Sequence, residues 1–177
     1  EARAATLFTT ACDAGNPDGC YNLGICQVQG RGVIKDEARA AALFTTACDG
    51  GNPGACSALG KLYALGHGVA KDQARAAALF IKACDGGHPE GCVNAGHAHA
   101  NGWGVRKDDV SAGMDYSMAC LLKSDEGCYH AAVLNIEGRS IDDDEANAAA
   151  FFAELCAAEG PFGPASCSRL GTLHLEG

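Results

Sequence analysis

Residues 48–56 read Cys-Asp-Gly-Gly-Asn-Pro-Gly-Ala-Cys, a turn-forming segment with a cysteine at each end. The same arrangement recurs four more times, the last copy being three residues longer: Cys12 to Cys20, Cys84 to Cys92, Cys120 to Cys128 and Cys156 to Cys167. From each copy to the next, the first cysteine advances by 36 positions. A fixed period of roughly 20 to 50 residues is typical of solenoids, so we interpret the chain as an array of repeats.

A helix is predicted on each side of this segment. Residues 36–48 are rich in strong helix formers, and their apolar residues recur at the i, i+3, i+4 and i+7 spacing of one helical face. These residues are Ala40, Leu43, Phe44 and Ala47. Asp36 suits the N-cap of this helix, Gly51 its left-handed C-terminal turn, and Pro53 the first position of the next helix. The apolar face of that second helix is formed by Cys56, Leu59, Gly60 and Tyr63.

Each cysteine pair ends one helix and begins the next across a tight turn, which brings the two Cα atoms within disulfide range. Zinc-binding cysteines usually form C-x₂₋₄-C knuckles or stand near histidine pairs, whereas the two cysteines of each pair here are separated by seven residues or more. We therefore predict disulfides rather than reduced or metal-bound cysteines. The predicted pairs are Cys12–Cys20, Cys48–Cys56, Cys84–Cys92, Cys120–Cys128 and Cys156–Cys167.

The eleventh cysteine, Cys26, has no partner in this register. In the other repeats its position is filled by apolar residues, namely Leu62, Ala98, Leu134 and Leu173. We expect a free, buried thiol that packs as a small hydrophobic group. A reactive thiol is the alternative.

The composition limits the class of protein. Hydrophobic residues make up 47% of the 177 residues but aromatic residues only 6%, and much of the apolar content is alanine, which suits closely packed helices. The net charge of −9 argues against nucleic acid as a partner, since binding to phosphates needs a basic surface. No stretch approaches the ~20 apolar residues of a membrane span. Disulfides persist in oxidising compartments, so we expect the bacterial periplasm or the extracellular space, with the mitochondrial intermembrane space as the alternative.

The repeats cover the whole chain without a linker, and we expect one continuous elongated domain. Neither end carries a distinct polar capping element, which solenoids need for solubility, so we expect a section of a longer array. The predicted units are a partial repeat 1–16, the repeats 17–52, 53–88, 89–124 and 125–163, and a partial repeat 164–177.

Residues 47–72 resemble a Sel1-like repeat, and the C-x₇-C pairs resemble the cysteine-rich subfamily that includes the Helicobacter cysteine-rich proteins. The resemblance implies an all-α, right-handed α/α superhelical solenoid, related to TPR arrays, in which each helix hairpin is stapled by a disulfide. It also implies a scaffold for other proteins. Two alternatives come with it: the penicillin-binding or β-lactamase-like activity described for some members of the subfamily, and a redox, haem- or metal-handling role like that of a mitochondrial intermembrane-space assembly factor of the same architecture.

Catalytic motifs are missing from the sequence. An acyl-enzyme β-lactamase would show Ser-x-x-Lys, and the nearest approach, Ser57 with Lys61, has the wrong spacing. There is no G-x-S-x-G, no H-E-x-x-H and no phosphate-binding glycine loop. His97 and His99 point to different faces of one helix and cannot chelate together. We therefore predict a non-enzymatic protein without a cofactor or metal, and we expect His99 to be satisfied at the edge of the helix–helix core.

The outward face of the first helix in each repeat is the predicted binding surface. Core positions repeat closely from one unit to the next, while these outward positions vary. Stacking would place them side by side on a concave wall, where solenoids bind proteins or extended peptides. The alternative is a merely solvated surface. The predicted contact residues are Asn22, Ile25, Lys61, Asn94, His97, His130 and Arg169.

Overall fold

The computed structural model describes residues 1–139, 145–157 and 160–176, and these residues form helices and turns without any strand. The predicted all-α solenoid of helix hairpins is confirmed. The ten helices of the described residues are α1 (Ala2–Asp13), α2 (Pro17–Gln29), α3 (Glu37–Asp49), α4 (Pro53–Leu65), α5 (Gln73–Asp85), α6 (Pro89–Asn101), α7 (Asp109–Leu121), α8 (Asp125–Ile136), α9 (Glu145–Ala157) and α10 (Gly163–Glu176).

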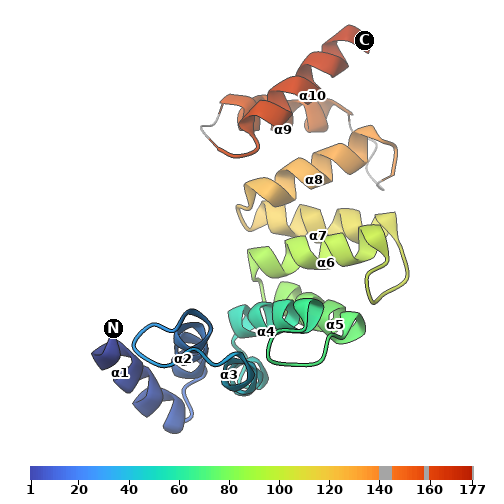
Figure 1. The fold of residues 1–177 in the computed structure, drawn as a ribbon. Coiled ribbons are helices and arrows are strands. Elements are labelled where there is room, and N and C mark those ends of the chain that lie inside the picture. Colours follow the sequence, from blue (N-terminus) through green and yellow to red (C-terminus); the bar gives the residue numbers. More distant parts are fainter. Residues whose placement is uncertain (140–144, 158–159, 177) are drawn as a thin grey trace.

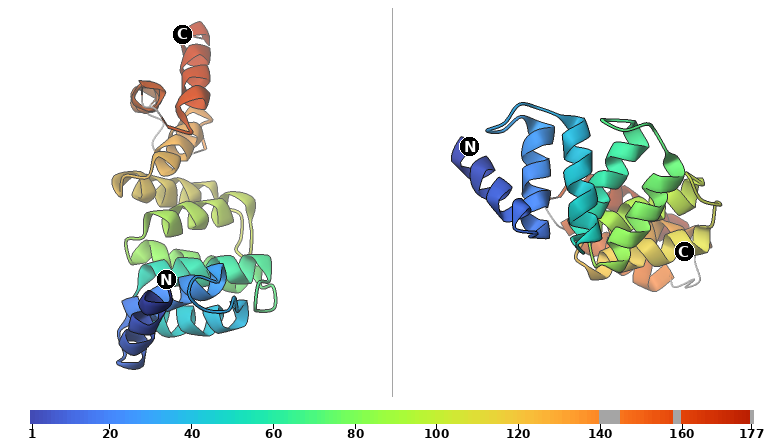
Figure 2. Two further views of the ribbon diagram at one scale, coloured as in Figure 1. Left: turned by 60° about the vertical axis from the view of Figure 1, so that its left-hand side comes forward. Right: turned by 90° about the horizontal axis from the view of Figure 1, so that it is seen from below.

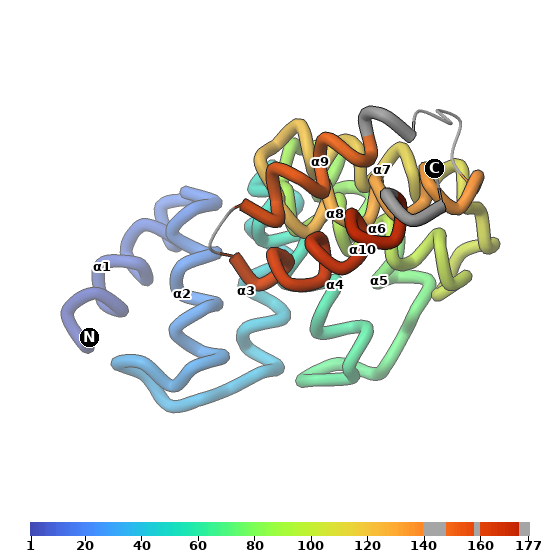
Figure 3. Tube along the Cα trace, turned by 90° about the horizontal axis from the view of Figure 1, so that it is seen from above, coloured from blue at the N-terminus to red at the C-terminus, as the bar shows by residue number. Residues whose placement is uncertain are grey.

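The helices follow one another in space in the order of the chain (Figure 1). Each helix packs mainly on its neighbours in sequence, and the first helices of adjacent repeats also touch, α4 with α6 and α6 with α8. The result is an elongated stack with the two termini at opposite ends (Figure 2). Seen from above, α1 and α2 lie to one side of the later helices, because the stack curves as it rises (Figure 3).

The turns between paired helices are determined by local chemistry, as the sequence predicts. The carboxylate of Asp36 accepts a hydrogen bond from the N–H of Arg39 at 2.9 Å and caps α3. At the other end of α3, Gly51 has a φ of +93°, a conformation that favours glycine. Asn52 then caps α4 through the N–H of Ala55 at 2.7 Å, and proline occupies the first turn of that helix.

Five cysteine pairs lie at disulfide distance in the register that the spacing predicts, with Cα–Cα distances between 4.3 and 4.8 Å. Each bridge joins an odd-numbered helix to the even-numbered helix after it, from α1–α2 to α9–α10. Cys26 on α2 is unpaired. We expected a buried thiol at this position, but the side chain of Cys26 is only half-buried.

In the core, buried aromatic rings of the odd-numbered helices pack against glycines of the even-numbered helices. A buried aromatic residue recurs every 36 positions on the odd-numbered helices: Phe44, Phe80, Tyr116 and Phe152. A Cβ atom at Gly60 of α4 would lie 2.7 Å from the ring of Phe80, and one at Gly96 of α6 would lie 2.5 Å from the ring of Tyr116. Only a glycine lets the two helices approach this closely. The phenol of Tyr116 is therefore held by the same packing that holds a phenylalanine in the other repeats.

The connectors between repeats also require glycine. Gly68 has a φ of +69°, and a Cβ atom there would overlap the backbone carbonyl of Glu37 at the start of α3. Gly104 stands in the same relation to Gln73 at the start of α5. The connectors thus lie directly on the preceding odd-numbered helix and fix the spacing between repeats. Among the described residues, we find no helix long and apolar enough to cross a membrane.

Candidate functional site

The even-numbered helices bring part of the predicted contact set together. We define the even-helix face as the surface formed by the outward residues of α4, α6 and α8, namely Lys61, Leu65, Asn94, His97, Glu126 and His130. Two features lie on it, a polar cluster between α6 and α8 and an apolar pocket between α4 and α6. His97 belongs to both.

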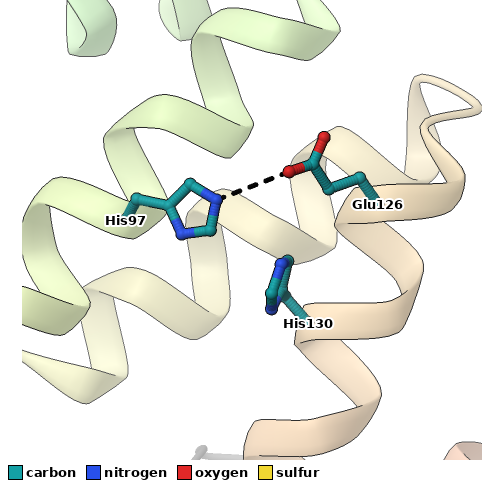
Figure 4. Close-up of side chains that lie close together, drawn as sticks. All are labelled: His97, Glu126 and His130. Atoms are coloured by element: carbon teal, nitrogen blue, oxygen red, sulfur yellow. Dashed lines mark ion pairs between the residues drawn. The ribbon is translucent and has the colours of Figure 1, made fainter. Parts of the chain in front are cut away.

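The polar cluster is centred on His97 of α6 (Figure 4). Its Nε2 atom lies 3.5 Å from Oε1 of Glu126, and its Nδ1 atom lies 2.8 Å from the hydroxyl of Tyr116. The ring of His130 lies edge-on to that of His97, with 4.9 Å between centroids, and is stacked on Tyr116 at 5.0 Å. One donor atom from each of His97, Glu126 and His130 lies within 4.8 Å of the other two.

Burial controls the charge of this cluster. The pKa of Tyr116 is raised, mainly because the phenol is desolvated and also because Asp115 and Glu126 oppose a negative charge there. The phenol therefore stays protonated and can donate a hydrogen bond to His97. The pKa of His130 is lowered by desolvation and by the neighbouring His97, against the opposing effect of Glu126. His130 is thus held in its neutral form, with a free ring nitrogen, over a wider pH range than an exposed histidine.

The apolar pocket has a volume of about 190 Å³. The amide Nδ2 of Asn94 is buried in this region and has no hydrogen-bond partner in the described part of the chain. Trp103 and Leu65, which are 55% and 62% exposed, stand at the pocket and offer apolar surface to solvent. A larger hollow of about 380 Å³, between the α7–α8 turn and α9, contains none of the predicted contact residues. The 190 Å³ pocket is lined by Lys61, Ala64, Leu65, Gln73, Ala77, Phe80, Asn94, His97, Ala98 and Trp103.

The remaining predicted contact residues are engaged within the protein or lie outside this region. The side-chain amide of Asn22 donates to the backbone carbonyl of Asp18 at 2.8 Å, and Ile25 packs against the core. Arg169 is exposed on α10, 3.8 Å from the carboxylate of Glu137. Lys61, which belongs to the even-helix face, is also engaged, because it is paired with Glu90 at the rim of the pocket.

His99 on α6 and His67 in the connector after α4 do not join the site. His99 is hydrogen-bonded to Asp115 at 2.7 Å, which agrees with its expected place at the edge of the core. The pKa of Asp115 is raised by burial, although the bond to His99 opposes the shift. His67 is exposed in the connector after α4.

Sequence reasoning identified Asn94, His97 and His130 as members of one face but did not bring Glu126 or Tyr116 into it. Two signals were available in the sequence. Glu126 and His130 stand four residues apart, so they share a helical face. An aromatic residue recurs every 36 positions at 44, 80, 116 and 152, and at position 116 this residue is a tyrosine, which carries a hydroxyl group.

Comparison with known proteins supports the fold. The model of the family described as the Sel1 repeat matches residues 17–52, 53–88 and 89–122, which together exceed half of the chain. No curated protein gave a match. With these repeat bounds, Cys48–Cys56 and Cys84–Cys92 each join the last helix of one unit to the first helix of the next.

Three solved structures are similar. The first is c5321, a protective antigen of uropathogenic Escherichia coli with an SLR fold, at 29% identity and a TM-score of 0.76 over 82% of this chain and 31% of that one. The second is a Sel1 repeat protein from Oxalobacter formigenes, at 22% identity and a TM-score of 0.78 over 84% of this chain and 61% of that one. The third is Helicobacter pylori cysteine rich protein B, at 28% identity and a TM-score of 0.59 over 71% of this chain and 90% of that one. The chain therefore spans less than two thirds of the first two proteins.

Proposed function

Because the chain belongs to the Sel1 repeat family, we propose that it is a non-catalytic scaffold that binds an extended segment of a protein partner along the even-helix face. Sel1 repeats mediate protein–protein interactions. The five disulfides indicate an oxidising environment, and we assign the scaffold to the bacterial periplasm or the extracellular space, with the mitochondrial intermembrane space as the alternative.

The observation that carries the proposal is the apolar pocket with the unpaired amide of Asn94 beside it. A buried amide N–H without an acceptor costs free energy, and rotation of the Asn94 side chain toward the pocket that it lines would let a partner's carbonyl oxygen supply the acceptor. An extended peptide supplies both groups that this region lacks, because its backbone offers a carbonyl every residue and its side chains can enter the pocket. Trp103 and Leu65 would cover the inserted side chain, and aromatic residues of this kind are frequent energetic centres of interfaces.

The test starts from a displayed library of random 12-residue peptides, selected on the oxidised protein. Affinities of a selected peptide are then measured by fluorescence anisotropy. Leu65→Glu should weaken binding about 30-fold, the equivalent of the ~2 kcal/mol that defines a hot spot. Asn94→Ala should weaken it about fivefold, which corresponds to the loss of one hydrogen bond of ~1 kcal/mol.

Met114→Glu on α7 is the matched control, because Met114 is 56% exposed, close to the value for Leu65, but lies away from the pocket. It should leave the affinity unchanged. If Met114→Glu weakens binding as much as Leu65→Glu, the partner uses another face. If the selection yields no peptide that binds, the extended-peptide mode is wrong. A nitrocefin assay on the same samples should show no hydrolysis.

A further inference from the structure

The cluster of His97, Glu126 and His130 comes from two helices of adjacent repeats. His97 projects from α6, and Glu126 and His130 project from consecutive turns of α8 toward it (Figure 4). All three side chains are half-buried. Such a placement requires the stacking of two repeats, so the three groups converge only in the folded array.

The separations suit a tetrahedral metal ion. Donor atoms at ~2.0–2.2 Å from a tetrahedral zinc ion stand roughly 3.3–3.6 Å from one another. Nε2 of His97 already lies 3.5 Å from Oε1 of Glu126, and no separation within the trio exceeds 4.8 Å. Adjustment of side chains alone, by about 1 Å, would therefore complete three corners of the tetrahedron.

The surroundings favour ligation over a simple ion pair. An ion pair between His97 and Glu126 involves two of the groups, and the ring contacts of His130 with Tyr116 and His97 hold the third group beside them. A ring nitrogen of His130 lies within 4.8 Å of the donor atoms of both His97 and Glu126, and a neutral imidazole nitrogen is a common metal ligand. The hydroxyl of Tyr116 at Nδ1 of His97 is an outer partner of the kind that orients metal-binding histidines. When Nε2 holds the metal, the single imidazole proton resides on Nδ1 and can be donated to the phenolic oxygen.

We propose that His97, Glu126 and His130 form a zinc site whose fourth position is open to solvent on the even-helix face. Two histidines and one carboxylate form a ligand set that zinc commonly uses with an open position. The side chain of Glu126 is 44% exposed and that of His97 is 28% exposed, so an ion can enter from solvent. The bound metal links α6 to α8 and adds a second, non-covalent tie between adjacent repeats beside the disulfides.

The experiment measures binding of zinc alone to the untagged, oxidised protein by competition with a chromophoric chelator. Cys26 is alkylated beforehand so that its thiol cannot contribute. One zinc ion should bind per chain. His97→Ala and His130→Asn should each weaken binding by about 100-fold or more, because outer partners of a metal site alone are worth roughly 10–100-fold. Cobalt in place of zinc should give the visible absorption bands of a tetrahedral site.

Two further variants keep the test decisive. Glu126→Gln changes a half-exposed side chain on the surface of α8 and leaves the helix core intact; it should weaken zinc binding at least tenfold without altering the circular dichroism spectrum. His67→Gln removes an exposed histidine outside the cluster and should have no effect. Equal affinity for zinc in the wild type, Glu126→Gln and His130→Asn would mean adventitious surface binding and would overturn the proposal. Zinc should also raise Tm in the wild type and the His67→Gln variant but not in the cluster variants.

Discussion

Replacement of Gly68 by alanine should destabilise the fold measurably, because the added methyl group meets the backbone of a neighbouring helix. A Cβ atom there overlaps the backbone of Glu37, which cannot rotate away as a side chain would, and the φ of +69° disfavours any other residue. The left-handed conformation costs about 1–2 kcal/mol for an L-residue. Overpacking costs about 1–3 kcal/mol. Gly68→Ala should therefore lower the free energy of unfolding by about 2–5 kcal/mol, before a small gain from the stiffer unfolded chain.

Gly87→Ala separates the two costs. Gly87 has a φ of +78°, but a Cβ atom there meets nothing within 4 Å. Only the conformational cost of about 1–2 kcal/mol applies, and the unfolded-state gain is common to both variants. Urea unfolding of the oxidised proteins should show Gly68→Ala to be less stable than Gly87→Ala by about 1–3 kcal/mol, or roughly 2–12 °C in Tm. Equal losses in the two variants would refute the idea that the connector is held by contact with α3.

Three further predictions concern the turns and the site. Lys123 has a φ of +67° in a turn where other repeats carry glycine, so Lys123→Gly should raise the stability by about 1 kcal/mol; an unchanged or lower Tm would contradict this. Replacement of Cys48 and Cys56 together by serine should cost about 2–3 kcal/mol, the chain-entropy value for so short a loop, and equilibrium unfolding that matches the wild type would disprove it. The pKa of His130 is lowered in the folded state by burial, so the unfolded chain takes up the proton first as the pH falls below about 6.5. The stability that this residue contributes is therefore present above that pH and lost below it, and His130→Asn should flatten the fall in Tm between about pH 7 and pH 5; an unchanged slope would count against it.

The helices and turns could be predicted because they are determined by residues close in sequence. Asp36 caps α3, as predicted, by accepting a hydrogen bond from the N–H three residues further along the chain. Asn52, which was not named in the prediction, caps α4 in the same way. Pro53 begins α4 where the missing N–H of proline is harmless. Because the sequence repeats every 36 residues, similar caps and turns recur along the chain.

The site could be predicted only in part, because its contacts depend on how repeats stack. Helical periodicity placed His97 and His130 on one face, but their approach to 4.9 Å between rings depends on the rotation between α6 and α8. The comparison of His97 with His99 tested chelation within a single helix, and so could not reveal a cluster assembled from two. Tyr116 is a core ring, and its hydroxyl matters only because Gly96 brings that ring beside His97.

The placement of the disulfides divides the chain into segments of unequal vulnerability to cleavage. A protease that cuts one turn inside a bridge, such as residues 49–55 or 85–91, leaves both fragments attached through sulfur. The connectors 66–72 and 102–108 are spanned by no bridge, so a single cut there severs the polypeptide into two pieces. Nicked molecules should therefore accumulate with their full mass on non-reducing gels while the turns are attacked, and every loss of mass reports an event in a connector. Among the loops, the connectors that pack on the odd-numbered helices are therefore the places where one cut separates the chain.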